Sequence, residues 1–533
     1  MRMLPKGIAA TLASLLLAVS CTPSATTTAS ASPARSAAAV QPVRGGTLTL
    51  VTDDQPATYD ADQETSPAAL DLLAPEYSLL YRVDPLDSTK LVPDVAAALP
   101  TLSADKLTVT VKVRDDVKFH DGAALTSADV LATYQKLVAA GSARRSWYAM
   151  VDSITAPDAT TVVFKLKNAS AAFTTLLASP WNLIYSAAKL KSDPRYYETN
   201  VDGTGPFVFV SNAKGSEWVA KKNAAYFGKD ATGAQLPYLD GIRVLVMRDA
   251  AARVAALKAK TATLDPRGVT PSERDDLARA IPSDLALQET PASCTEMLIP
   301  NVNAKPLDDV RVRQALTQSI DRRGNNTALA QKIDVKDIGG LDRPGSTFAL
   351  ADADLQKVKG FGTDAAAAKD AAKKLLADAG QSALTLKLLT GTATVDQVIG
   401  DFVIDQWKQV GVTATRDSRA TSRDVVASGQ FQVALDTVCT VLDEPDLVLA
   451  RFRGAFGDSK LDGLIDAQSR ETDANKRATA VGDVERYVLD EKAYAFPIIW
   501  RLRIVPQLRT LRGWRASSAD GNGEDLAAAW IGP

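Results

Sequence analysis

The chain has 533 residues, which is too long for one small core and indicates two to four domains. Its composition, 46% hydrophobic and 23% charged, is that of an ordinary folded protein, and the formal net charge is −2. This balance, without a block of basic residues, argues against nucleic acid as a partner, and the single histidine, His120, excludes any site that needs two.

The N-terminus has the pattern of an exported protein. Arg2 and Lys6 precede a short apolar run, Ile8–Val19, which is too short to span a bilayer and predicts a signal peptide over residues 1–20. Small residues then precede Cys21, as in the lipobox of bacterial lipoproteins, although alanine stands where leucine is usual, three positions before the cysteine. The alternative is a plain secretory signal with a chance cysteine.

The segment after Cys21 predicts a tether. Residues 22–42 are rich in Ser, Thr, Ala and Pro, a composition that cannot bury apolar surface. We therefore assign residues 21–44 to a lipidated cysteine and a flexible tether. Two acyl chains on Cys21 would hold the exported protein on the outer face of the cytoplasmic membrane, which is the periplasmic side where an outer membrane is present.

Strands and helices alternate along the rest of the chain, which predicts a mixed α/β fold. Apolar and polar residues alternate over Leu107–Val113, as in a half-exposed strand. Thr126 and Asp129 form a capping-box-like start to a helix that runs towards Leu137. Further strands are expected at Thr47–Thr52, Thr161–Lys167, Phe207–Val210 and Ile242–Met247, and further helices at Ala250–Lys258, from Thr363 or Asp364 to Gly380, and along the apolar face from Val395 to Val410.

The sequence carries few motifs of catalytic sites. The sequence lacks a His-Glu-x-x-His zinc motif, a Gly-x-Ser-x-Gly elbow, a P-loop and a Gly-x-Gly-x-x-Gly fingerprint, so we expect no catalytic residue, metal site or cofactor. His120 and Asp121 are neighbours, but adjacent side chains on an extended chain point apart. Ser186 and Lys189 match the Ser-x-x-Lys of secreted penicillin-binding enzymes without the partner motifs of that class. A secreted acyl-serine enzyme is therefore the enzymatic alternative.

Six segments, read in order, resemble one family. They are Gly45–Leu48, Leu107–Val130, Gly203–Phe207, Asn223–Phe227 with Pro237–Asp240, Pro306–Leu316 continuing to Arg322, and Leu375–Gly380. The chain from about 45 to 530 is similar in this respect to the oligopeptide, dipeptide and nickel-type extracellular solute-binding proteins of bacterial ABC importers.

The resemblance implies a two-lobed periplasmic-binding-protein-like α/β fold, with hinge strands and an extra domain inserted in the first lobe. The first lobe would comprise residues 45–78, 204–293 and 497–533, the inserted domain 79–203, and the second lobe 294–496. Ligand would be trapped between the lobes by hinge closure.

The cysteine count favours one disulfide. If Cys21 carries lipid, Cys294 and Cys439 remain as an even pair in an oxidising compartment. The alternative is two buried free thiols. The resemblance supports the pair, because some oligopeptide binders carry a disulfide between the start of the second lobe and the strand that faces the ligand.

The resemblance also implies where ligand binds. Peptide binders often carry Trp-x-x-Asp-Tyr-x-x-Pro after this strand, and the aspartate pairs with the peptide α-ammonium. Aligning that motif on Glu444-Pro445 places Val438 at the tryptophan, Val441 at the aspartate and Leu442 at the tyrosine. The expected ligand-binding residues are Val438, Thr440, Val441, Leu442 and Asp443. Because Val441 carries no charge, a ligand with a free N-terminus is in doubt.

The expected function is that of a monomeric, non-enzymatic receptor. It would capture oligopeptides or peptide-like solutes by lobe closure and deliver them to ABC permease subunits in the membrane. One alternative is a receptor of the same family for a sugar, a chelated metal or another small molecule. A receptor that signals rather than delivers is a third reading, and the sequence does not separate it from the first.

Overall fold

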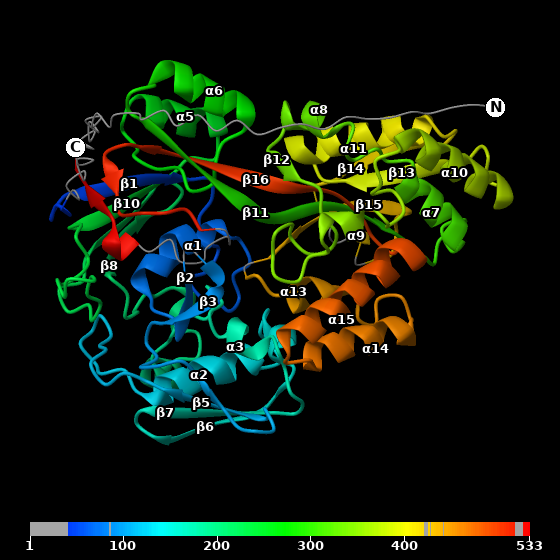
Figure 1. Cartoon of the computed structure of the whole chain (residues 1–533). Helices are drawn as coiled ribbons and strands as arrows, with labels where there is room; N and C mark the ends of the chain where they lie inside the picture. The colour runs from blue at the N-terminus through cyan, green and yellow to red at the C-terminus, as the bar shows by residue number, and fades with distance from the viewer. Residues whose placement is uncertain are drawn as a thin grey trace, which may run out of the picture. The chain divides into compact units, whose positions relative to one another are not determined.

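The computed structural model describes residues 41–84, 87–420, 425–426, 428–440, 442–517 and 526–532 (Figure 1). Residues 42–533 form one compact unit. The predicted signal peptide and Cys21 lie outside the described residues. Among the residues that are described, no helix has both the length and the apolar character needed to cross a membrane.

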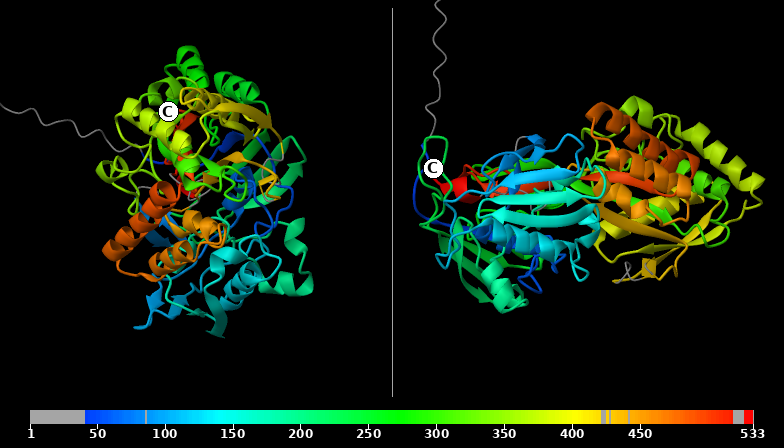
Figure 2. Two further views of the ribbon diagram at one scale, coloured as in Figure 1. Left: turned by 90° about the vertical axis from the view of Figure 1, so that its right-hand side faces the viewer. Right: turned by 90° about the horizontal axis from the view of Figure 1, so that it is seen from below.

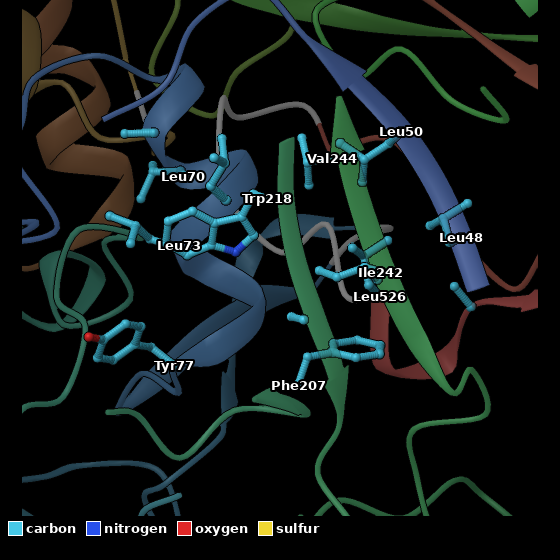
Figure 3. Packing of buried hydrophobic residues seen from close by; sticks show 14 of the residues in the cluster. Leu48, Leu50, Leu70, Leu73, Tyr77, Phe207, Trp218, Ile242, Val244 and Leu526 are labelled. Atoms are coloured by element: carbon cyan, nitrogen blue, oxygen red, sulfur yellow. The ribbon is translucent and has the colours of Figure 1, made fainter. Parts of the chain in front are cut away.

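A four-stranded sheet, which we call the N-terminal sheet, opens the fold. Its order is β1 (Thr47–Thr52), β10 (Gly241–Val246), β9 (Glu217–Lys222) and β8 (Phe207–Ala213), with β1 parallel to β10. Leu48 and Leu50 pack on one face with α1 (Ala68–Leu73), as Figure 3 shows, whereas Val51 packs on the other face with α5 (Ala250–Lys258) and α6 (Pro271–Ala280). The alternation of side chains along β1 therefore serves two cores.

An antiparallel sheet, the inserted sheet, follows along the chain. Its order is β4 (Thr101–Leu102), β5 (Thr108–Lys112), β7 (Thr161–Leu166) and β6 (Val151–Asp158). Helix α2 (Ser127–Val138) packs on it, and Thr126 and Asp129 form a capping box at its start, which confirms the predicted helix. The smaller elements nearby are the hairpin β2 (Tyr81–Asp84) and β3 (Asp87–Pro93), and helices α3 (Phe173–Leu176) and α4 (Ala187–Ser192).

A six-stranded sheet, the large sheet, has the order β12 (Val335–Asp337), β16 (Phe496–Leu508), β11 (Leu285–Pro300), β15 (Val433–Cys439), β13 (Thr385–Thr390) and β14 (Thr413–Ser418). One apolar core beside it includes residues of α7 (Val310–Gln318), α10 (Ala365–Asp378) and α11 (Thr394–Lys408). A second core includes residues of α9 (Asp352–Leu355), α13 (Asp446–Leu449), α14 (Ser459–Arg470) and α15 (Ala474–Arg486). Among the residues that the structure describes, the remaining α-helix and strands are α8 (Asn326–Ala330), β17 (Leu511–Arg512) and β18 (Trp530–Ile531).

Two long strands belong to both halves of the molecule. β11 has 16 residues and β16 has 13, and they pair antiparallel with a register shift between Pro291 and Thr295. On one side of this shift Leu285 packs in a core of the N-terminal sheet, and on the other Leu298 packs in a core of the large sheet. Figure 1 shows the pair running between the two halves. These strands have the position expected of the hinge.

The predicted domain ranges stay a prediction, and several contacts cross them. Trp181 and Tyr185, from the predicted inserted domain, pack in the core of the N-terminal sheet. Leu442, from the predicted second lobe, packs in the core of the inserted sheet. In Figure 2 (right) the cyan strands of the inserted sheet lie beside the orange helices of the large-sheet half, and the backbone N–H of Ala171 donates to the carbonyl of Ser469 at 3.0 Å.

Candidate functional site

The carboxyl ends of three parallel strands meet at one edge of the large sheet. β13 is parallel to both β14 and β15, so Thr390, Ser418 and Cys439 lie at this edge, and the hydroxyls of Thr390 and Ser418 are 3.0 Å apart. In open α/β sheets ligands bind outside the carboxyl ends of the strands. This edge is therefore where the topology of the sheet predicts a ligand site.

The two remaining cysteines lie at the same edge. Cys294 on β11 is directly opposite Cys439 on β15, and the structure joins them as a disulfide with 4.0 Å between the Cα atoms. The bond ties the last residue of β15 to the crossing strand, next to the register shift. The segment that follows β15 therefore leaves the sheet from a fixed point.

The expected ligand-binding residues at the end of β15 and after it lie in different parts of the molecule. Val438 is 2% exposed and packs beside Met297 in a core of the large sheet, and Leu442 is 2% exposed in the core of the inserted sheet. Thr440 is half-buried, and Val441 lies outside the described residues. The structure does not bring Val438 and Leu442 together, because the two side chains pack in the cores of different sheets.

Asp443 is already paired. Its carboxylate lies 3.5 Å from the guanidinium of Arg343, and both side chains are largely buried. Burial raises the pKa of Asp443, and the positive charge of Arg343 opposes that rise. A carboxylate in this state already has a cation, so it is poorly placed to serve a ligand ammonium as well.

The loop that carries Arg343 is held from two sides. The indole N–H of Trp500 donates to the carbonyl of Gly340 at 3.1 Å, and the backbone N–H of Asp342 donates to Glu485 at 3.0 Å. A Cβ on Gly340 would meet Oε1 of Glu485, so a larger residue here would force this buried carboxylate to move. Burial raises the pKa of Glu485 to about 7 and that of Asp342 well above its ordinary value.

A second ion pair fixes the turn after Asp443. Glu444 and Arg477 are both nearly inaccessible, and Nη1 of Arg477 donates to Oε2 of Glu444 at 3.0 Å. Burial raises the pKa of Glu444, and Arg477 opposes that rise. Because each partner is buried, this pair positions the turn and is not free to bind solute.

The crossing strand β16 carries two arginines, Arg501 and Arg503, two residues apart. Nη1 of Arg501 lies 3.5 Å from Glu296, a fully buried carboxylate that also accepts from the hydroxyl of Thr437 at 2.8 Å. Arg503 donates to the carbonyl of Ser517 at 2.9 Å. The Arg501 side chain is 36% exposed, so its guanidinium can still contact a ligand.

Acidic groups surround the two arginines on both sides of the crossing. Burial raises the pKa of Glu296, and it raises that of Asp334 to about 7, while the charge of Arg501 opposes both rises. Towards the N-terminal sheet, Asp71 lies 2.9 Å from Arg267 and accepts from the Thr52 hydroxyl at 2.8 Å. The strands that join the two halves thus pass through a polar, charged region.

Comparison with known proteins gives the family. The model described as "Bacterial extracellular solute-binding proteins, family 5 Middle" matches residues 90–460. The chain belongs to this family. Among curated proteins, this family 5 chain is 31% identical over 224 residues to the glutathione-binding protein GsiB of Pectobacterium atrosepticum, and 29% identical over 239 residues to GsiB of Escherichia coli K12. The matches cover 42% and 44% of this chain and 42% and 45% of those relatives, so less than half of their length.

Solved structures show the fold of this family 5 protein. DppA of Helicobacter pylori, in complex with the peptide STSA, superposes with a TM-score of 0.76 at 18% identity over 92% of this chain and 98% of that chain. AgaA of A. tumefaciens R10, in complex with agropinic acid, gives 0.76 at 22% identity over 92% and 99%. CtaP of Listeria monocytogenes gives 0.77 at 21% identity over the same shares. The fold is therefore that of the two-lobed periplasmic binding proteins, as the sequence predicts.

The motifs weighed for catalysis have structural roles in this family 5 protein. Ser186 caps α4, accepting from the backbone N–H of Lys189, whose ammonium lies 3.1 Å from Asp121. Asp121 raises the pKa of Lys189, whereas a general base needs a lowered pKa. His120 hydrogen-bonds the carbonyl of Gly205 at 3.1 Å, and burial lowers its pKa. Within the described ranges, no three His, Cys, Asp or Glu side chains are grouped to hold a metal ion.

Sequence reasoning missed the partners of the expected site. Arg343, Glu485, Arg501 and Glu296 are far from Asp443 in the chain, and no local pattern singles them out. The one available signal is Gly339-Gly340 before Arg343, because paired glycines mark a place where the backbone approaches another group closely.

Proposed function

We propose that this protein is the extracytoplasmic substrate-binding component of an ABC importer, which captures peptides or peptide-like solutes by closure of its lobes. The observation that carries the proposal is the pair of strands, β11 and β16, shared by the cores of both halves. A ligand that contacts both lobes only when they are closed shifts the population towards the closed form. The membrane permease would then receive the closed, loaded protein.

Peptide-like ligands fit the charges near the crossing strands. The part-exposed Arg501 suits a ligand carboxylate, and the acids around it suit a ligand cation. The names of the relatives are consistent with this choice, because two are called glutathione-binding proteins and one structural neighbour holds a peptide.

A non-peptide solute is the second candidate, and one observation favours it. Asp443, the nearest carboxylate to the family aspartate in sequence, is paired with Arg343, so no free carboxylate is placed there for a peptide α-ammonium. The structural neighbour AgaA holds agropinic acid, which is not a linear peptide.

Ligand identity is tested directly by mass spectrometry of small molecules released from protein purified from its host without refolding. A peptide or glutathione-like mass supports the first candidate, and a sugar, opine or metal chelate supports the second. Uptake of the identified solute should also fall to background when the cognate permease gene is deleted. Undiminished uptake in that strain would contradict a role in import.

Membrane attachment through Cys21 is part of the same proposal. We expect the mature protein to begin at Cys21 and to partition with membranes, because the apolar run before it is too short to span a bilayer. Cys21→Ala should release the protein or leave it unprocessed. An unchanged mature N-terminus and membrane fraction in that variant would rule out the lipid anchor.

A further inference from the structure

A cavity of about 320 Å³ lies away from the site described above, between the inserted sheet and the helices of the large-sheet lobe. One wall is formed by residues 146–147, 149–150, 167–170 and Leu176, and the other by residues of α13 and α14 and the segment between them. None of Val438, Thr440, Leu442, Asp443, Arg343 or Arg501 lines it. Its volume is at the lower end of the range of small-molecule sites.

Positive charge is in excess on the wall of this cavity. The lining cations are Lys167, Arg451, Arg453 and Arg470, and the lining carboxylates are Asp446 and Asp466. Asp466 lies 2.8 Å from Arg453 and 3.5 Å from Arg470, so one carboxylate serves two guanidinium groups.

Lys167 is the cation left over. The lining holds four cations and two carboxylates, and one of these carboxylates, Asp446, already lies 3.9 Å from Arg477, which does not line the cavity. Arg451 pairs with Asp436, which does not line the cavity either. Nζ of Lys167 donates to the carbonyl of Ala149 at 2.9 Å, and no carboxylate of the described residues lies within 4.0 Å of it. The ammonium of Lys167 could therefore form an ion pair with an anion in the cavity.

Apolar groups form the rest of the lining. Trp147, Met150, Leu176 and Leu447 contribute an aromatic ring, a thioether and two leucines. Apolar walls with a few placed charges are typical of sites for small organic ligands. We propose that this cavity binds a small organic anion, a carboxylate or phosphate ester that carries an apolar group about the size of one ring.

Binding there would favour the closed arrangement of the lobes. The two walls come from parts that meet at the contact between Ala171 and Ser469, and Leu447 packs against the core of the inserted sheet. A ligand that touches Lys167 and Arg470 together contacts both walls only while they are apposed, so its affinity adds to closure. This coupling rests on the hinge closure proposed above, whereas binding itself does not.

Calorimetric titration of the full exported chain with phenyl phosphate tests the site, with inorganic phosphate and benzyl alcohol as the matched anion-only and ring-only probes. We expect phenyl phosphate to bind at least tenfold more tightly than either, and Lys167→Met to weaken it about fivefold or more. Lys165→Met is the control, because Lys165 is exposed two residues earlier on β7 and does not line the cavity. Equal affinity for phenyl phosphate and phosphate, or equal effects of the two substitutions, would overturn the proposal.

Small-angle scattering of the same samples separates binding from coupling. We expect phenyl phosphate to reduce the radius of gyration of the wild type but not of Lys167→Met. Binding without compaction would overturn the coupling. In that case compaction with the released native solute would show that hinge closure, and with it the proposed function, stands on its own.

Discussion

Asp443, one of the expected ligand-binding residues, already forms an ion pair with Arg343 inside the protein. The side chains of Asp443 and Arg343 are 8% and 13% exposed. Each therefore compensates the charge that the other buries. A peptide ammonium would have to displace Arg343 to use this carboxylate. Some of the charged side chains near the expected ligand site therefore have structural roles. Residue type alone does not show which of them do.

We expect Asp443→Asn to destabilise the protein by about 2–4 kcal/mol without changing any preference for free over acetylated peptide N-termini, because the substitution removes the negative charge that faces the largely buried guanidinium of Arg343. Urea unfolding and peptide titration measure the two effects. Asp436→Asn is the control, since its partner Arg451 is 47% exposed and the loss should stay under about 1 kcal/mol. A preference for free N-termini that disappears only in Asp443→Asn would make Asp443 the ligand anchor.

Asp334 predicts a pH dependence of stability. Its pKa is about 7 in the folded protein against 3.8 ordinarily, because burial opposes its charge and one of its oxygens lacks a hydrogen-bond partner. A raised acid pKa stabilises the fold below about pH 4, and that stabilisation is lost as pH rises towards 7. Asp334→Asn should thus be more stable than wild type by about 2 kcal/mol at pH 8, allowing for solvent screening, and equal to it near pH 4.

Urea unfolding at pH 4, 6 and 8 measures this difference. A gap between Asp334→Asn and wild type that is the same at all three pH values would show that Asp334 does not titrate as its burial requires. Asp337→Asn, close by on β12, is a control for changes of net charge alone.

At the scale of elements, local sequence signals and packing agree closely. The capping box at Thr126 begins α2, and Ile399 and Val403 of the predicted apolar face are buried in α11. Gly411, with a φ of +89°, ends that segment before β14. These elements were predictable because the apolar periodicity and the end signals lie within one turn or a few residues.

The disulfide acts at this scale, because it joins β11 to β15 where the hinge begins. Replacing both Cys294 and Cys439 with alanine should lower stability by about 2–4 kcal/mol, while solute still binds. The bond spans a sequence separation of 145, for which the chain-entropy model gives an upper estimate of about 5 kcal/mol. Thermal unfolding of the variant and of reduced wild type should agree. A variant as stable as the oxidised wild type would show that the strand pairing alone holds this edge.

At the scale of the whole molecule, the proposed function depends on two halves that share two strands. A true ligand should stabilise the folded protein by about 2.7 kcal/mol at a hundredfold excess over its dissociation constant. It should also reduce the radius of gyration, because the proposed mechanism requires the ligand to contact both lobes only when they are closed. Differential scanning calorimetry and small-angle scattering measure these together. A ligand that raises the melting temperature without compaction would argue against the hinge.

The sequence by itself determined the family, the α/β class and many of the helices and strands, because each depends on short-range patterns or on the order of motifs along the chain. Only the tertiary structure decided which charged side chains pair and which core each apolar side chain joins. Arg343 reaches Asp443 across 100 positions, and Leu442 leaves the predicted pocket for the core of the inserted sheet. Burial and ion pairing between distant residues depend on which surfaces pack together in three dimensions, and that packing leaves no local periodicity in the sequence.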